Sequence, residues 1–411
     1  MMNTLPGLDL IRDAAAHLAP ILRRTPCVRS GFFSRLAERD VWVKYENCQK
    51  TGAFKLRGAA NTVRQLTDAE RARGVIATSA GNHAQGVALA ARAHGATARI
   101  VMPEATPLTK ISATRGYGAE VILHGNNYDE AYAHTLELVE QHGYTFIHPF
   151  NDPRVIAGQG TLGLEVLEQC PEVETIVVPI GGGGLIAGIA LAVKALRPEV
   201  RIVGVEPEGA AAMKLSVAHG QLETLPRVDT IADGIAVRRP GELAFEVVRE
   251  HVDEVVLVSD QEIAAALVRF LERCKSLAEP AGAAALAALT NGRIPGGKGP
   301  TVAMVCGGNI DLLLLSRIID RGMQQAGRLG RLRVRMLDKP GSLLLLAETI
   351  ARCRANVLHI HHDRNHLDIG YNEARVDLSI QTRDWEHLQE VVRALQEAGF
   401  PVEFVSGEES D

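Results

Sequence analysis

Short apolar runs alternate with longer Ala- and Leu-rich segments from about residue 40 to residue 320. Apolar runs bounded by turn formers are typical of buried strands, and the longer segments between them are typical of helices. The expected strands are Val75–Thr78, Ala98–Met102, Glu120–Leu123, Thr145–Ile147, Thr175–Ile180, Arg201–Glu206, Val255–Val258 and Thr301–Val305. Glu262–Glu272 and Ala281–Leu289 are examples of the expected helices. The alternation predicts an α/β fold with doubly wound parallel sheets.

The pattern changes at a polar, glycine-bearing stretch, residues 321–330, which we interpret as a linker. It separates a main domain, residues 1–320, from a C-terminal domain, residues 331–411. The expected C-terminal elements are, in order, the strand Leu332–Leu337, the helix Leu343–Cys353, the strands Val357–His362 and Glu373–Thr382, the helix Asp384–Ala398 and the strand Val402–Val405. This βαββαβ order predicts a ferredoxin-like module.

Composition and charge bound the class of protein and its partners. The chain has 411 residues, of which 46% are hydrophobic and 23% charged, as in soluble globular proteins. A net charge of −5 gives no reason to expect nucleic acid or an anionic membrane as a partner. Pro179 and four glycines interrupt the longest uncharged stretch, so no membrane span is expected. The six cysteines form no CxxC pair, which favours a reducing, cytoplasmic setting.

One lysine lies in an unusual setting. Residues 51–58 read Thr-Gly-Ala-Phe-Lys-Leu-Arg-Gly, so Lys55 follows turn formers and Phe54 and precedes a small-residue segment. A lysine amine that is withdrawn from water loses its proton readily and then forms Schiff bases with carbonyl compounds. The alternative for this stretch alone is a surface lysine before a helix, with Arg57 as a solvated charge.

Three further loops each follow a predicted strand. They are residues 79–83 (Ser-Ala-Gly-Asn-His), residues 181–184 (four glycines) and residues 306–309 (Cys-Gly-Gly-Asn). Backbone N–H groups at the start of a helix are unpaired, so such loops suit anions such as phosphate. The carboxyl ends of parallel strands meet at one edge of a sheet, and we therefore expect these loops to converge on one crevice.

Together these motifs resemble the threonine dehydratase (threonine ammonia-lyase) family of fold-type-II pyridoxal-phosphate enzymes, over about residues 5–320. The shared motifs are residues 51–58, 79–83 and 181–184, Ala232-Asp-Gly234, Glu279-Pro280 and residues 306–309. The resemblance implies two doubly wound subdomains, the smaller inserted at roughly residues 50–150. It also implies a lyase that uses pyridoxal 5'-phosphate to convert L-threonine to 2-oxobutanoate and ammonia, with L-serine, which would give pyruvate, as a further expected substrate.

The same resemblance implies a role for each site residue. Lys55 would carry the cofactor as a Schiff base and move the Cα proton, with Phe54 against the pyridine ring. Asn82 would bind the phenolic oxygen, and the phosphate would be held by Gly181, Gly182, Gly183 and Gly184. The loop that receives the substrate carboxylate would consist of Ser79, Ala80, Gly81 and His83. The Gly234 carbonyl and the Glu279 side chain would flank the substrate amine and the cofactor ring.

Cys306 would face the pyridine nitrogen as a neutral partner. A carboxylate there would stabilise a long-lived carbanion, whereas a neutral thiol favours loss of the β-hydroxyl over transamination. From the residues alone, two other interpretations stay open. Cys306 is also compatible with an inert buried thiol, and Glu279 with a cap on the helix that starts near Pro280.

Other functions on this scaffold remain as alternatives. Serine racemases of this fold carry a second serine as the opposite-face acid/base, where this chain has Ala80. A serine dehydratase or a hydroxyaspartate ammonia-lyase is a further alternative, and so is an amino-acid sensor with an inactive front domain. Those racemases also bind a divalent metal through acidic residues just after the third strand of the large domain. This chain keeps Glu206 and Glu208 but has Ala212 at the later carboxylate position, so no metal is expected.

Residues 331–405 resemble an ACT domain through the turn Asp338-Lys-Pro-Gly-Ser-Leu343. That resemblance implies an allosteric enzyme whose C-terminal domains pair and bind an amino acid. We expect a homo-oligomer, a dimer or tetramer, with a branched-chain amino-acid effector such as isoleucine or valine. A role in isoleucine biosynthesis fits these expectations.

Overall fold

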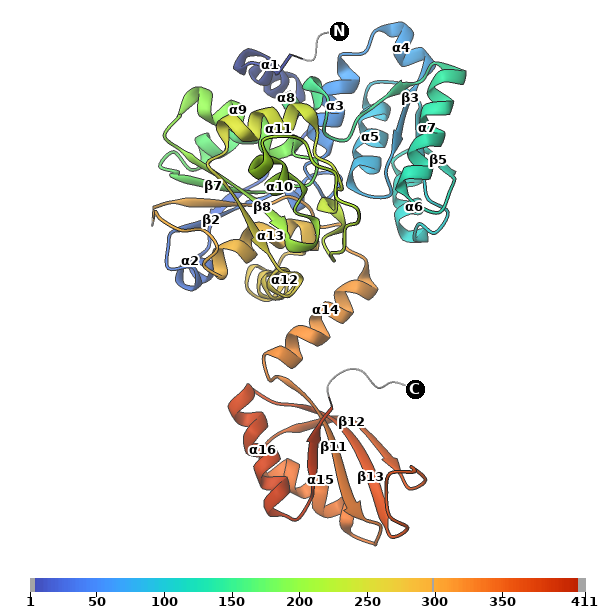
Figure 1. Cartoon of the computed structure of the whole chain (residues 1–411), viewed down its shortest axis with the longest axis vertical. Helices are drawn as coiled ribbons and strands as arrows, with labels where there is room; N and C mark the ends of the chain where they lie inside the picture. Colours follow the sequence, from blue (N-terminus) through green and yellow to red (C-terminus); the bar gives the residue numbers. More distant parts are fainter. Residues whose placement is uncertain (1–3, 298, 406–411) are drawn as a thin grey trace. The chain divides into compact units, whose positions relative to one another are not determined.

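Two parallel sheets organise the N-terminal part of the chain in the computed structural model, which describes residues 4–297 and 299–405 (Figure 1). The chain divides between Ile310 and Asp311 into two compact units. The strands of the first unit are β1 Cys27–Arg29, β2 Val41–Tyr45, β3 Val75–Thr78, β4 Ala98–Met102, β5 Glu120–Leu123, β6 Thr145–Phe146, β7 Thr175–Pro179, β8 Arg201–Pro207, β9 Glu254–Val258 and β10 Thr301–Val305.

The helices of the first unit lie between these strands. They are α1 Leu8–Leu18, α2 Gly31–Leu36, α3 Leu56–Arg64, α4 Asp68–Arg73, α5 Asn82–Ala93, α6 Leu108–Gly116, α7 Tyr128–His142, α8 Pro153–Gln169, α9 Gly184–Leu196, α10 Ala212–His219, α11 Glu242–His251, α12 Asp260–Cys274 and α13 Pro280–Thr290, with the short 3-10 helices η1 Glu46–Cys48, η2 Glu208–Ala210 and η3 Asp233–Ile235. Local signals set several starts: Thr67 and Ser259 form capping boxes with Glu70 and Glu262, and proline opens α8 and α13.

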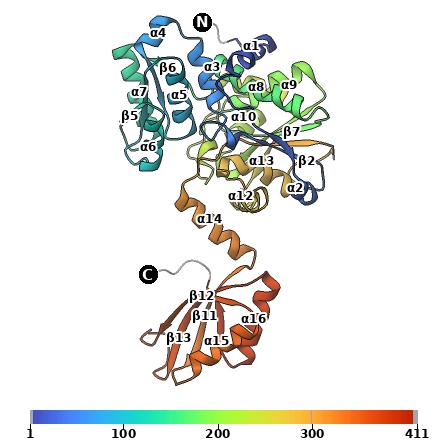
Figure 2. The same ribbon diagram turned by 180° about the vertical axis from the view of Figure 1, so that it is seen from behind.

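The larger sheet has the order β1-β2-β10-β7-β8-β9, and its strands are parallel except for the antiparallel β1–β2 pair. Helices α12 and α13 cover one face, and α8, α9 and α11 cover the other (Figures 1 and 2). The smaller sheet, β5-β4-β3-β6, is entirely parallel. We call residues 56–146 the small subdomain and the rest of this unit the large subdomain. This confirms the predicted α/β class with parallel sheets.

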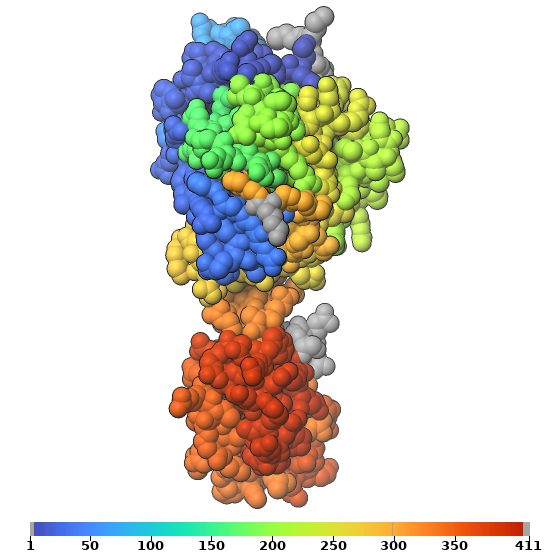
Figure 3. All heavy atoms as spheres, turned by 90° about the vertical axis from the view of Figure 1, so that its left-hand side faces the viewer, coloured from blue at the N-terminus to red at the C-terminus, as the bar shows by residue number. Residues whose placement is uncertain are grey.

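Segments far apart in the sequence meet at one edge of the larger sheet. Strand β2 pairs with β10, and Arg39 Nη2 donates to the carbonyl oxygens of Ile294 and Gly296 at 2.8 and 2.9 Å. Figure 3 shows the blue and orange segments side by side on this face. Within the described ranges, no helix is both long enough and apolar enough to cross a membrane.

The second unit contains α14 Leu312–Gln325, β11 Leu329–Leu337, α15 Ser342–Arg352, β12 Asn356–Asp363, β13 Glu373–Gln381, α16 Trp385–Glu397 and β14 Val402–Phe404. Its antiparallel sheet has the order β12-β13-β11-β14, and Leu346 of α15 and Val391 of α16 pack with the sheet residues Val334 and Val376 in one core. From β11 onwards the element order is the predicted βαββαβ.

The expected linker differs from the structure. Residues 321–330 were expected to connect two domains, yet α14 continues to Gln325 and β11 starts at Leu329. The boundary between the units lies after Ile310, ten residues before the expected end of the main domain at 320. The cause is the apolar periodicity of α14, which outweighs the glycine at 322 within the helix.

Candidate active site

The loop that carries Lys55 is hydrogen-bonded to the segment at the end of β10. The Phe54 N–H donates to the Cys306 carbonyl at 3.1 Å, and Ala53 forms an isolated antiparallel bridge with Gly307. Lys55 itself occupies the N-cap position of α3. Two of the predicted loops are therefore adjacent, and the lysine stands where helix α3 begins.

The amine of Lys55 is half-buried and has few polar contacts. Its Nζ donates to the Pro149 carbonyl at 3.2 Å and lies 5.1 Å from the centre of the Phe54 ring. Burial lowers the pKa of Lys55 from 10.5 to about 8, although the nearby Cys306 and Glu279 act in the opposite sense. An amine with this pKa is neutral in a large fraction of molecules near pH 8, so it can act as a nucleophile and as a base.

The loop at residues 79–83, which belongs to the small subdomain, lies next to the lysine loop and the end of β10. Asn82 Nδ2 donates to Glu279 Oε1 at 2.6 Å, and Asn309 Nδ2 donates to Asn82 Oδ1 at 2.7 Å. Asn309 Nδ2 also donates to the Thr51 carbonyl at 2.8 Å, which ties the lysine loop into the same network. Asn82 keeps one amide N–H that these bonds do not use, as its predicted contact with a phenolic oxygen requires.

The residues predicted to receive a carboxylate surround the start of α5. This helix has no side-chain cap, so its first N–H groups suit an anion. Ser79 Oγ accepts from the Gly81 N–H at 3.1 Å, and Ala80 offers only a methyl group. The His83 ring is buried, and its Nε2 lies 2.8 Å from the Ile147 carbonyl oxygen; burial lowers its pKa to about 3. The Nε2 contact with Ile147, the residue after β6, holds the ring in place, so we expect the backbone N–H of His83 to make the predicted contact.

The tetraglycine loop connects β7 to α9 and fits a phosphate group. Gly183 has a φ of +91°, which favours glycine, and a Cβ on Gly184 would lie 2.8 Å from the Phe150 carbonyl oxygen. Gly182 packs directly under the Phe150 ring, which leaves no space for a side chain. Among the described residues, the N–H groups of 181–183 find no protein acceptor. These unpaired donors at a helix start are what a phosphate needs.

Glu279 stands at the N-cap position of α13, but its side chain makes no cap hydrogen bond. Its carboxylate instead accepts the bond from Asn82. Burial and the charge of Asp233 raise the pKa of Glu279 to about 7, whereas the bond from Asn82 and the charge of Lys110 lower it. A Cβ on Gly234 would be 3.4 Å from Glu279 Oε1, so both residues predicted to flank the substrate amine are neighbours. The side chain therefore binds Asn82 and does not cap α13.

Cys306 lies at the end of β10 and is 3% exposed. Burial raises the pKa of its thiol far above the ordinary value, so the group is neutral at physiological pH. Its Sγ is 3.6 Å from the Ala281 carbonyl oxygen. A neutral sulfur in this place fits the predicted partner of a pyridine nitrogen.

The segment 148–151 is a part of the site that the motifs do not mark. Besides Pro149 and Phe150, it contains His148, whose Nδ1 accepts from the N–H groups of Phe150 and Asn151 at 3.2 and 2.8 Å. Asn151 Oδ1 in turn accepts from the Leu243 N–H at 3.1 Å. The signal available in the sequence is the run of turn-forming residues between a predicted strand and the Asp-Pro start of α8.

Arg57 corrects one expectation. It was expected to be a solvated charge, but it is fully buried. Its Nε and Nη2 donate to the two oxygens of Glu46 at 2.8 Å, and its Nη1 donates to Glu165 Oε1 at 2.6 Å. Arg57 lies two residues after Lys55, so this network fixes the start of α3 against η1 and α8.

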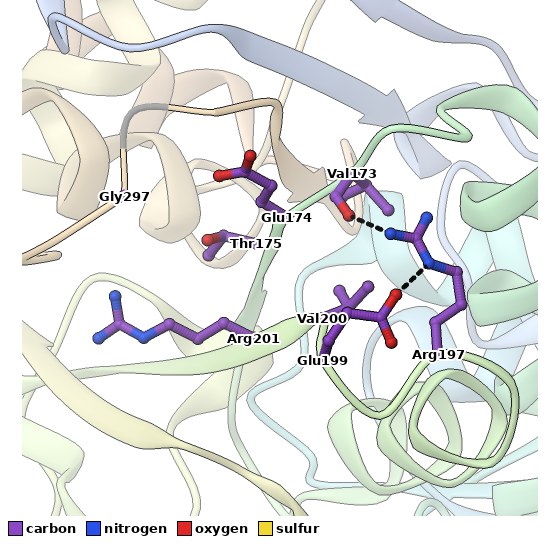
Figure 4. Close-up of a pocket in the computed structure, with 8 residues that line it drawn as sticks. All are labelled: Val173, Glu174, Thr175, Arg197, Glu199, Val200, Arg201 and Gly297. Carbon is purple, nitrogen blue, oxygen red and sulfur yellow. Dashed lines mark hydrogen bonds and ion pairs between the residues drawn. The ribbon is translucent and has the colours of Figure 1, made fainter.

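A surface cavity of about 290 Å³ lies at the opposite ends of the strands (Figure 4). Thr175 and Arg201, the first residues of β7 and β8, line it together with Arg197. The Arg197 guanidinium is already bound to Glu199 at 2.7 Å and to the Val173 carbonyl at 3.3 Å. No predicted site residue lines this cavity, so it is separate from the crevice.

Glu206 is one of the two acidic positions that the sequence analysis compared with a metal site. Its two carboxylate oxygens accept the N–H groups of Met213 and Lys214, each at 2.8 Å. The side chain thus holds the start of α10. Burial raises its pKa to about 7.

A family model of pyridoxal-phosphate dependent enzymes matches residues 18–307 of the chain. Two relatives, both named L-threonine ammonia-lyase, are similar over almost their whole length. The protein from Thermotoga maritima is 45% identical over 398 residues, which cover 97% of this chain and 99% of the relative. The protein from Geobacter sulfurreducens is 48% identical over 394 residues, which cover 96% and 98%.

Solved structures give the same family. Maize serine racemase superimposes with a TM-score of 0.74 at 39% identity, covering 78% of this chain and 99% of that one. The processed threonine deaminase isoform 2 from Solanum lycopersicum has a TM-score of 0.72 at 38% identity, covering 78% and 91%. The N-terminal unit thus has the fold-type-II architecture, and the unpaired glycine N–H groups, the desolvated amine and the neutral thiol fit the cofactor. The chain belongs to the family of pyridoxal-phosphate dependent enzymes, with pyridoxal 5'-phosphate as its cofactor.

Proposed function

We propose that the chain is an L-threonine ammonia-lyase, which eliminates water from L-threonine and yields 2-oxobutanoate and ammonia. L-serine would give pyruvate in the same way. The observation that carries the proposal is the Lys55 amine, with a pKa of about 8, placed among the anion-binding loop starts and the neutral Cys306. The near full-length similarity to two L-threonine ammonia-lyases supports it.

Bound pyridoxal phosphate supplies the electron-withdrawing ring that makes the Cα–H bond of an amino acid acidic. Lys55 would hold the cofactor and, once the substrate has taken its place, would accept the proton from Cα as a neutral amine. The β-hydroxyl then leaves with a proton as water. Return of Lys55 to the cofactor would free the product as an enamine. Hydrolysis of its imine form would use one water and release ammonia and the 2-oxo acid.

The other site residues bind and orient the cofactor and the substrate. We assign the cofactor phosphate to the N–H groups of Gly181, Gly182, Gly183 and Gly184, and its phenolic oxygen to Asn82. Phe54 would pack against the cofactor ring, and the Cys306 thiol would face the ring nitrogen. The Gly234 carbonyl and the Glu279 carboxylate flank the substrate amine on the remaining side.

The start of α5 receives the substrate carboxylate through Ser79 Oγ and the backbone N–H groups of residues 80–83. Ala80 has no group that can donate or accept a proton, so the face of Cα opposite Lys55 lacks an acid there. The likeness to maize serine racemase makes racemisation the second candidate. Ala80 is the observation against it.

We further propose that the C-terminal unit is an ACT domain and regulates an enzyme of isoleucine biosynthesis. Its βαββαβ order and the turn with Gly341 at a φ of +91° support this assignment. Strand β12 lies at the edge of its sheet and exposes Leu358 and Ile360, which suits pairing with a second copy in a homo-oligomer. Isoleucine or valine is the proposed effector. Six free cysteines among the described residues are consistent with a cytoplasmic location.

The experiment that tests the catalytic proposal is release of 2-oxo acid by the cofactor-loaded protein. L-threonine, D-threonine and L-serine are supplied separately, and the products are separated to distinguish 2-oxobutanoate from pyruvate. We expect fast release from L-threonine, slower release from L-serine and none from D-threonine. A loaded protein that converts L-serine to D-serine but releases no 2-oxo acid would overturn the proposal in favour of the racemase.

A further inference from the structure

Two ion pairs join the small subdomain to one segment of the large subdomain. Lys110 on α6 contacts Asp233 at the start of η3, with 2.9 Å between Nζ and Oδ2. Asp129 on α7 contacts Arg238, with 3.1 Å between Oδ2 and Nη1. Both pairs cross between the same two parts of the molecule within six residues of the large subdomain, but only the first adjoins the crevice.

Asp233 precedes Gly234, whose Cα faces Glu279 Oε1. Its carboxylate is therefore the like charge that acts on Glu279 from the η3 side. Lys110 lies beyond Asp233 and carries the opposite charge. In agreement with these positions, Asp233 raises and Lys110 lowers the pKa of Glu279.

Glu279 also connects the subdomains, because it accepts the hydrogen bond from Asn82. A carboxylate accepts that bond more strongly than a carboxylic acid does. Two links thus run from the small subdomain to the region of Glu279: the hydrogen bond from Asn82 to Glu279 and the ion pair between Lys110 and Asp233. By offsetting the charge of Asp233, Lys110 favours the ionised form of Glu279 and so strengthens the bond from Asn82.

We propose that Lys110 is a positioning residue: by pairing with Asp233 it offsets the like charge that Asp233 places beside Glu279, and the ionised Glu279 then holds Asn82 in place for the reaction. The proposal rests on the proposed function only for its effect on catalysis. The Lys110–Asp233 pair itself is partly exposed, so it contributes little to stability, and its effect falls on the protonation of Glu279.

The other groups that face Glu279 are the same in the Asp233 and Lys110 variants, so they cannot cause a difference between the two. They are the Asn82 amide from α5, the Asn309 backbone N–H after β10, and the titratable groups Lys55 and Cys306, whose pKa values Glu279 raises. All four stay unchanged when Asp233 or Lys110 is replaced. A shift of opposite sign in the two variants must therefore come from the pair.

The test is a pH titration of Glu279 in the cofactor-loaded, full-length protein. The protein is labelled with ¹³C at the glutamate side-chain carboxyl, and the Glu279 signal is assigned by its loss in Glu279→Gln. Asp233→Asn removes a like charge and should lower the titration midpoint, and Lys110→Met removes an opposite charge and should raise it. We expect each shift to be about half a pH unit. Asp129→Asn, which breaks the other ion pair between the subdomains, should leave the midpoint unchanged.

Shifts in the same direction for Asp233→Asn and Lys110→Met, or no shift in either, would overturn the proposal. An equal shift in Asp129→Asn would do so as well, because it would indicate a general effect of charge. The pH profile of kcat/KM for L-threonine should move with the titration midpoint. If the titration shows opposite shifts but no 2-oxo acid forms from L-threonine, the control of Glu279 by Lys110 and Asp233 stands and the proposed function fails.

Discussion

Asn82 Nδ2 donates a 2.6 Å hydrogen bond to Glu279 Oε1, and this bond joins α5 of the small subdomain to the N-cap residue of α13 in the large one. Asn309 holds the other side of the same amide. The direction in which Asn82 presents its free N–H therefore depends on two residues from separate loops. Loss of either partner should disturb cofactor binding without touching Lys55.

Cofactor capture should report the pKa of Lys55 directly. Only the neutral amine attacks a carbonyl, so the capture rate of the cofactor-free protein should rise about tenfold per pH unit and level off above about pH 8. Rapid-mixing absorbance measures the rate. Lys55→Ala should form no covalent adduct, and Lys50→Ala, which changes an exposed lysine of the same loop, should follow the wild type. A plateau only above pH 10 would contradict a desolvated amine.

Cys306 should tolerate a neutral substitute but not a charged one. Cys306→Ser keeps a small neutral group and should retain activity within about threefold, because the pyridine nitrogen still lacks a negative partner. Cys306→Asp should reduce 2-oxobutanoate release by at least about tenfold and increase conversion of the cofactor to its amine form. Product analysis and absorbance measure the two effects. Equal activity in both variants would remove the proposed role of the thiol.

Replacement of Arg57 should destabilise the protein strongly. Arg57→Leu leaves the buried Glu46 without its bidentate partner, and we expect a loss of about 3–5 kcal/mol in the free energy of unfolding. Arg64→Leu, on the same helix, breaks a more exposed pair with Asp13 and should cost less than about 1 kcal/mol. Urea unfolding measures both. Adding Glu46→Leu to Arg57→Leu should recover part of the loss; no recovery would indicate that the packing of the side chain, and not its charge, matters.

The C-terminal unit should be required for effector control and not for catalysis. A chain that ends at Ala326, the C-cap of α14, lacks the antiparallel sheet but keeps all proposed site residues. We expect it to retain the cofactor and most of its activity with L-threonine and to lose any response to isoleucine or valine. Initial rates with and without each amino acid measure this. An isoleucine response that persists in the shortened chain would place the effector site elsewhere.

The central parallel strands β3, β7 and β10 could be predicted because their runs of apolar residues are buried on both faces, which leaves a plain signal. The β1–β2 pair lacks that signal. Lys44 in β2 is fully buried and bound to Glu165 at 2.5 Å, so a charged residue occupies a position that hydrophobicity alone would assign to the surface. The same reason explains Arg57, since a buried charge is visible only when its partners from other elements are known.

The glycine loops and Lys55 could be predicted because each motif is local in the sequence. The network around them could not, because its members come from distant elements. Lys110 and Asp233 are 123 residues apart, and nothing in either segment indicates that they meet. Glu279 illustrates the limit, since its position before Pro280 suits a helix cap and only the Asn82 contact shows where the side chain goes.

The His148 ring makes the connection between the subdomains insensitive to acid. Two backbone N–H groups bind its Nδ1, and burial lowers its pKa to about 4. The ring therefore stays neutral, with its proton on Nε2, over the physiological pH range. We expect the loop at residues 148–151 to keep its conformation when the pH falls within that range. A kinetic transition between about pH 6 and pH 9 then has no contribution from the loop that connects the two halves, whereas burial brings the pKa values of Glu206, Glu279 and Lys55 into that range.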